Sequence, residues 1–136
     1  MAIKKFLNGD KLLSTEIVSA GGGVNLENLF KYSTDETPIG TWINGKTIYR
    51  RIYPVSLSAA GTYEIADVPT NMELAIRLYG WITAYSNTNF RMLPMVGHDM
   101  NNMIRLDVTN RKIRIIQTDS WTGYNGYIIM EYTTNK

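Results

Sequence analysis

The segment QTDSWTGYNGYIIM, residues 117–130, carries the side chains best suited to binding a small polar ligand. Its glycines predict a loop between two strands. An aromatic ring can stack on the apolar face of a sugar, and carboxylate and amide groups beside it can hydrogen-bond to the hydroxyls. The candidate saccharide-binding residues are therefore Asp119, Trp121, Tyr124 and Asn125. The alternative is that Trp121 packs over the end of the fold as a lid.

Catalysis has less support in the sequence. The single histidine, His98, is followed by Asp99, but neighbouring residues on a strand point to opposite sides, and no serine lies in a G-x-S-x-G context. A glycosidase needs two carboxyl groups roughly 5–10 Å apart. Asp99, Asp107 and Asp119 can be considered for that role, yet a chain with 12 acidic residues offers many such sets. We expect no catalytic residues.

Metal and cofactor sites are not expected either. The chain has no cysteine and one histidine, which disfavours a transition-metal site. It also has no calcium-binding loop and no phosphate-binding loop. Basic side chains do gather in the stretch 105–114, where they either meet an anionic wall polymer or form a solvated strand face. They are Arg105, Arg111, Lys112 and Arg114.

Length and charge narrow the function classes. A chain of 136 residues fits one domain. A net charge of +2 gives no reason to expect nucleic acid or an anionic membrane as a partner. The sequence also contains nothing close to the ~20 consecutive apolar residues of a membrane span.

From Thr47 onward the pattern is that of short strands. The runs are rich in Ile, Tyr and Val, and glycine, proline or asparagine separates them. No amphipathic helix alternates with them. The sequence therefore predicts an all-β protein, an antiparallel β-sandwich or jelly-roll-like head. The predicted strands are 47–55, 61–68, 71–85, 89–98, 126–134 and the two arms of a hairpin within 102–119.

Local signals place several of these strands. The run 126–134 is apolar on both faces, which predicts a central strand. Pro94 predicts an edge strand, and Gly80 predicts a bulge in the strand 71–85. Thr109 to Arg111 supply the turn of the hairpin.

Residues 41–51 predict a second hairpin. Thr41 to Ile43 form a short strand, and Asn44-Gly45 is expected to form a type I′ turn before the chain returns through Lys46. On this prediction Trp42 packs inward against the sheet as a fold element.

The first 31 residues differ from the rest. Three consecutive glycines, residues 21–23, suggest a flexible joint, and 24–32 can form a short helix or an extended arm. We therefore expect an attachment and trimerisation segment over 1–31 and a β-sandwich head over 32–136. The apolar side chains expected at the trimer contact are Val24, Leu26, Leu29 and Phe30.

Two segments also carry a resemblance. YSTDETPIGTWINGKTIYRR, residues 32–51, resembles a recurrent stretch in the carboxy-terminal head domains of tailed-bacteriophage tail-fibre and receptor-binding proteins. SWTGYNGYIIMEYTT, residues 120–134, resembles the ending of the same domains. Thr47 stands where that family usually has proline, and Arg51 stands where it usually has lysine. The likeness brackets residues 32–136 and does not reach 1–31.

The resemblance implies a compact β-sandwich, usually a homotrimer, that displays a host-binding surface for bacterial saccharides. It assigns the motif to the scaffold and transfers no sugar site. We therefore expect a virion fibre protein on the tail or capsid surface, made in the host cytoplasm and attached to other virion proteins through residues 1–31. The expected function is adhesion to a host surface glycan without cleavage. The alternatives are a structural or decoration role without a receptor and, third, a glycan-cleaving enzyme.

Overall fold

The computed structural model describes residues 26–84, 89–96 and 102–135. Val24 and the rest of 1–25, and the His98–Asp99 pair, lie outside the described residues. The described elements are a short helix, α3 (Leu26–Leu29), and eight strands, which are β1 (Thr37–Thr41), β2 (Thr47–Ser56), β3 (Gly61–Asp67), β4 (Met72–Thr83), β5 (Phe90–Leu93), β6 (Ile104–Thr109), β7 (Lys112–Gln117) and β8 (Asn125–Thr134).

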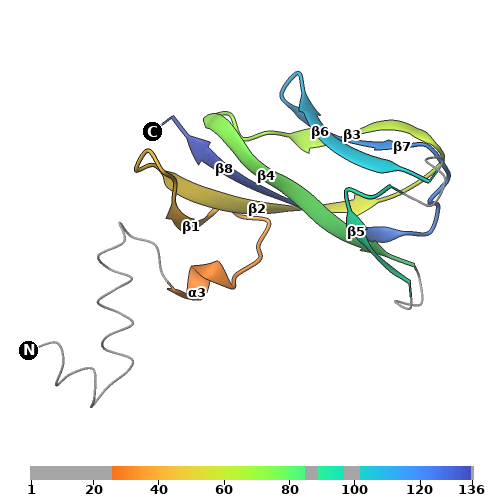
Figure 1. The fold of residues 1–136 in the computed structure, drawn as a ribbon, viewed down its shortest axis with the longest axis horizontal. Helices are drawn as coiled ribbons and strands as arrows, with labels where there is room; N and C mark the ends of the chain where they lie inside the picture. The colour runs from red at the N-terminus through yellow and green to blue at the C-terminus, as the bar shows by residue number, and fades with distance from the viewer. Residues whose placement is uncertain (1–25, 85–88, 97–101, 136) are drawn as a thin grey trace, which may run out of the picture.

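The strands form two antiparallel sheets that stack face to face (Figure 1). The larger sheet has the order β1-β2-β8-β4-β5, and the smaller has the order β3-β7-β6. The chain passes from one sheet to the other after β2, β3, β5 and β7. This architecture confirms the predicted all-β sandwich.

Strand β8 lies at the centre of the larger sheet, as its apolar sequence predicted. Its inward face contributes Ile128, Met130 and Tyr132 to the core between the sheets. From Ile129 onward its outward face is buried as well: Ile129 is 1% exposed and Thr133 is fully buried. A strand flanked by β2 and β4 and covered on both faces has few positions for polar residues, which accounts for its composition.

The edge prediction is confirmed at β5, a four-residue strand that ends just before Pro94. Strand β4 departs from simple alternation. Bulges fall between Met72 and Leu74 and between Ala75 and Arg77, so Leu74 is 43% exposed. Gly80 is not at a bulge, which corrects that prediction. Its lack of a side chain is needed because a Cβ there would overlap the Tyr127 carbonyl oxygen on β8.

The hairpin of β6 and β7 is confirmed, with Asn110 and Arg111 as its two turn residues. Both have positive φ, 51° and 60°, as a type I′ turn requires. The turn between β1 and β2 is of another kind.

In that turn Gly45 N donates to Trp42 O at 2.9 Å, and Gly45 has a φ of 86° while Asn44 keeps a negative φ. Asn44 Oδ1 accepts a hydrogen bond from Lys46 N, which stabilises this conformation of the turn. The type I′ prediction was wrong, and β1 ends at Thr41. Trp42 is partly buried and is not among the side chains that pack against the main core.

Three tyrosines that are buried or half-buried have raised pKa values. Tyr132 OH donates to Glu36 Oε2 at 2.5 Å, and burial together with this carboxylate raises the pKa of Tyr132. Burial also raises the pKa values of Tyr53 and Tyr79. A raised folded-state pKa contributes stability that is present below the unfolded value of about 10 and is lost as the pH rises further.

We therefore expect the urea concentration at the midpoint of unfolding to decrease as the pH is raised from about 9 to about 11, because the tyrosines of the unfolded chain ionise over this range. Tyr132→Phe removes one such group, so its midpoint should change less over the same range. Urea titrations followed by far-UV circular dichroism measure both proteins. A wild-type midpoint that stays constant over this range would contradict the prediction.

Candidate functional site

The predicted saccharide loop connects β7 to β8, and its two aromatic rings turn inward. Trp121 and Tyr124 pack against the core in an edge-to-face pair, with ring centroids 5.1 Å apart and planes at 82°. Trp121 N donates to Ser58 O, and Tyr124 N donates to Trp121 O. This is the arrangement expected of the alternative, in which Trp121 closes the end of the sandwich.

The other two predicted residues lie apart from this pair. Asp119 is exposed, and its Oδ1 accepts a hydrogen bond from Ser120 N at 2.7 Å. Asn125 is the first residue of β8. Because alternate residues of a strand share a face, Asn125 lies on the same side as Tyr127 and on the other side from the buried Ile128, which is the outer face of the larger sheet. The structure therefore does not bring the four side chains to one surface.

A groove does open on that outer face, where β2 and β4 end and β8 begins. Its volume is about 540 Å³, within the range of roughly 300–1,000 Å³ typical of small-molecule sites. It is lined by Pro54, Val55, Ser56, Trp81, Thr83, Ala84, Asn125, Gly126 and Tyr127. Asn125 is the one predicted saccharide residue that it contains.

Two aromatic rings dominate this outer-face groove. Trp81 on β4 and Tyr127 on β8 are register partners, and their ring centroids lie 5.3 Å apart with planes at 46°. Tyr127 is 43% exposed. On the neighbouring edge strand Met92 pairs with Trp81 and is 57% exposed, which extends the apolar surface beyond the groove.

The register of β4 against β8 puts Trp81 in this position. Trp81 alternates with the fully buried Ile82, and this signal was present in the sequence. The partner ring of Tyr127 could not be found in that way, because strand pairing between distant segments leaves no local pattern.

Of the described residues that line the groove, Tyr127 is the one with an ionisable side chain, a phenol. The basic residues of 105–114 lie on the smaller sheet instead, and three of them have intramolecular partners. Arg114 makes two 2.7 Å hydrogen bonds to Asp107, which lower the pKa of that carboxyl, and Lys112 pairs with Asp67 at 2.6 Å. Arg111 donates to the Pro69 carbonyl oxygen. Their charge is thus partly compensated within the chain.

A second, more open hollow of about 740 Å³ is charged. Its ionisable residues are already engaged: Glu36 by Tyr132, Asp67 by Lys112, and Arg51 by the Thr34 carbonyl oxygen. Over the described ranges, no group of three or more His, Asp or Glu side chains is placed to hold a metal ion.

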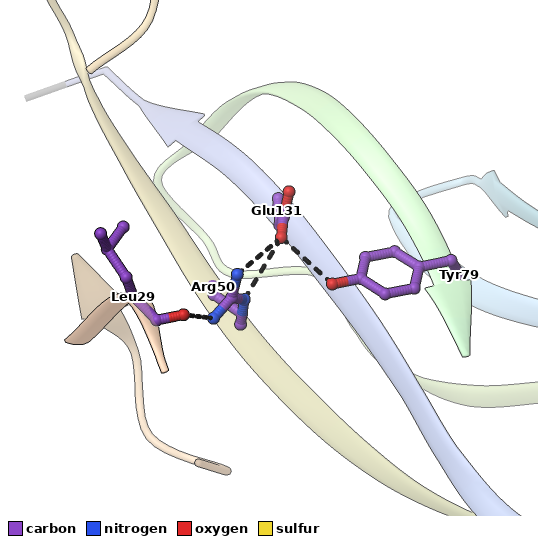
Figure 2. A network of polar contacts seen from close by, with 4 residues as sticks. All are labelled: Leu29, Arg50, Tyr79 and Glu131. Carbon is purple, nitrogen blue, oxygen red and sulfur yellow. Dashed lines mark hydrogen bonds and ion pairs between the residues drawn. The ribbon is translucent and has the colours of Figure 1, made fainter. Parts of the chain in front are cut away.

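A buried ion pair fixes helix α3 to the outer face of the larger sheet (Figure 2). Arg50 Nε and Nη2 each donate to Glu131 Oε2 at 3.2 Å, and Tyr79 OH donates to the same oxygen. Arg50 Nη1 donates to Leu29 O at 2.9 Å, and the guanidinium stacks on the Tyr32 ring at 4.5 Å. Arg50 therefore joins the end of the predicted attachment segment to the head.

No helix in the described part of the chain is long and apolar enough to cross a membrane. The chain matches no protein-family model, no curated protein and no solved structure.

Proposed function

We propose that this protein is a bacteriophage virion fibre protein whose trimeric head adheres to a saccharide on the host cell surface without cleaving it. The observation that carries the proposal is the outer-face groove. It presents aromatic rings and neutral polar groups on the rigid end of a β-sandwich, which is the composition of a sugar-binding surface.

The resemblance to phage fibre heads gains support from how its two segments lie. The first contains β1 and the start of β2, and the second ends in β8. β2 and β8 are hydrogen-bonded neighbours, with Tyr49 opposite Tyr132 and Arg50 opposite Glu131. Segments far apart in sequence thus build one central sheet unit, as expected for a scaffold motif.

Trimerisation has a candidate surface at α3. Leu26, Leu29 and Phe30 are 44%, 39% and 77% exposed, and the neighbouring Tyr32 is 53% exposed. Together with Val24, which lies outside the described residues, Leu26, Leu29 and Phe30 were the residues expected at a threefold contact. Apolar side chains gathered in this way favour burial against other copies. Three heads on one fibre then raise the avidity of a weak sugar contact.

Phe30→Glu in the full-length protein should dissociate the trimer, because a charge at the contact would be buried without a partner. We expect the light-scattering mass to fall from about three times 15.5 kDa to a single 15.5 kDa chain. The matched control is Ile43→Glu, which charges an apolar side chain that is 92% exposed at the turn between β1 and β2. A wild-type monomer, or equal masses for both variants, would contradict the trimer contact.

The function itself is tested with labelled full-length protein on an array of purified bacterial surface glycans. Saturable binding without release of reducing ends supports an adhesin. Release of reducing ends would instead support the glycan-cleaving enzyme. Binding to no glycan and to no bacterial cells would leave the decoration role. Immunoelectron microscopy of virions would distinguish tail from capsid placement. Virions without label would contradict the assignment to a virion protein.

A further inference from the structure

We infer that the outer-face groove between Trp81 and Tyr127, rather than the loop at Trp121, takes the saccharide, and that its ligand is a neutral pyranose with one unsubstituted C–H face. This inference rests on the proposed function, and it names the site and the ligand class. Asn125 is the residue that it shares with the saccharide prediction made from the sequence.

The two rings provide a platform with an open face. Their planes are tilted by 46°, so neither ring covers the other completely. Tyr127 keeps 43% of its surface exposed in a groove that holds about 540 Å³. The negative face of an aromatic ring attracts the weakly positive C–H groups on one side of a pyranose. The loop rings of Trp121 and Tyr124 are less available for this, because they are partly buried against the core and pack edge to face on each other.

Polar groups at the edge of the groove suit sugar hydroxyls. The exposed side chains of Ser56 on β2 and Asn125 on β8 lie at paired positions, and neither forms a side-chain hydrogen bond with another described residue. A hydroxyl and a carboxamide can each donate and accept, as sugar hydroxyls can. Both residues are therefore free to bond a ligand that stacks on the rings.

The charge of the lining selects among sugars. Among the described residues, no Asp, Glu, Lys or Arg side chain lines the groove. A uronic acid or an amino sugar entering it would lose hydration of its charge without gaining an ionic partner. A neutral hexose or an N-acetylated hexosamine carries no such cost. The groove should thus discriminate against charged monosaccharides.

A second copy of this chain is the competing occupant, because Phe90 and Met92 beside the groove are also exposed. We favour the sugar because the surface is hollowed and has polar groups at its edge. A flat apolar face would fit another sheet better. Light scattering of each variant distinguishes a second copy from a sugar.

The test uses full-length protein labelled with 5-fluorotryptophan and observed by ¹⁹F NMR. The chain has three tryptophans, Trp42, Trp81 and Trp121, so single Trp→Phe variants assign each resonance. The neutral probes are methyl glycosides and short oligomers of glucose, galactose, mannose and N-acetylglucosamine, with glucuronic acid and glucosamine as charged probes. We expect a neutral sugar to shift the Trp81 resonance and to leave the Trp121 resonance unchanged. A shift confined to Trp121, or one produced only by charged probes, would overturn the inference.

Variants test the same site by affinity. Trp81→Ala should weaken binding of the best neutral glycan roughly tenfold, and Asn125→Ala should weaken it roughly fivefold. Phe90→Ala, which removes an exposed ring outside the groove, should change it less than about twofold. If Trp81→Ala fails to fold, Tyr127→Ala replaces it. Light scattering must give every variant the wild-type mass, and a mass lowered by Trp81→Ala would assign the face to a second copy instead.

The two proposals fail in different ways. Wild-type protein that binds no glycan on the array removes saccharide adhesion, and the site with it. If the wild-type protein binds a glycan and the Trp81→Ala and Asn125→Ala variants bind it with unchanged affinity, saccharide adhesion stands and only the groove is excluded as the site.

Discussion

Gly126→Ala is expected to destabilise the protein by roughly 3 kcal/mol or more, a large effect for one added methyl group. The Cβ would overlap the carbonyl oxygen of Trp81 and come within 2.8 Å of the Ile82 Cα. Both atoms belong to the backbone of β4, so no side-chain rotation can make room. The central pair of the larger sheet, β4 and β8, would have to separate there.

Urea denaturation followed by circular dichroism measures this loss. The matched control is Gly40→Ala on β1, where the added Cβ would lie 3.9 Å from Ile48 Cδ1, an ordinary contact. Alanine is also the better residue in a strand, so this variant should stay within about 1 kcal/mol of wild type. Equal stabilities for the two variants would show that β4 and β8 are not as close as the structure places them.

These two strands also show how far the sequence predicts the fold. The central position of β8, the edge position of β5 and the β6–β7 hairpin each follow from a local pattern: two-sided apolarity, a proline and a run of turn residues between alternating strands. Gly80 was assigned to a bulge because glycine in a strand has two meanings, a bulge or a close backbone approach. The two explanations for Gly80 can be distinguished only when the position of β8 beside β4 is known.

The candidate site was harder to predict for the same reason. The loop at Trp121 has the composition of a sugar-binding surface, but composition does not say which way a ring points. The groove depends on the pairing of Trp81 with Tyr127 across two strands. Sequence alternation gives the face of each residue on its own strand and says nothing about its neighbour across the sheet.

Breaking the ion pair between Arg50 and Glu131 is the second large effect. Their side chains are only 10% and 12% exposed. Arg50→Met or Glu131→Gln alone leaves a buried group without its partner, and each should cost roughly 3–5 kcal/mol. The double variant Arg50→Met/Glu131→Gln removes both charges, so it should be more stable than the sum of the single losses predicts.

A double-mutant cycle by urea denaturation measures that coupling. The matched control is Lys46→Met, since Lys46 pairs with Glu73 at the surface, where the side chains are 33% and 44% exposed. That pair should contribute less than about 1 kcal/mol. Additive losses in the cycle would show that Arg50 and Glu131 stabilise the head independently of each other.

The two single variants should also differ at helix α3, because only Arg50 reaches it. Arg50→Met removes the donor to the Leu29 carbonyl oxygen and the stacking on Tyr32, whereas Glu131→Gln keeps both. We therefore expect faster hydrogen exchange of the amides in 27–32 in Arg50→Met than in Glu131→Gln at matched global stability. Equal exchange in the two variants would mean that Arg50 stabilises the sheet without holding α3, and that the apolar side chains of α3 are positioned by other contacts.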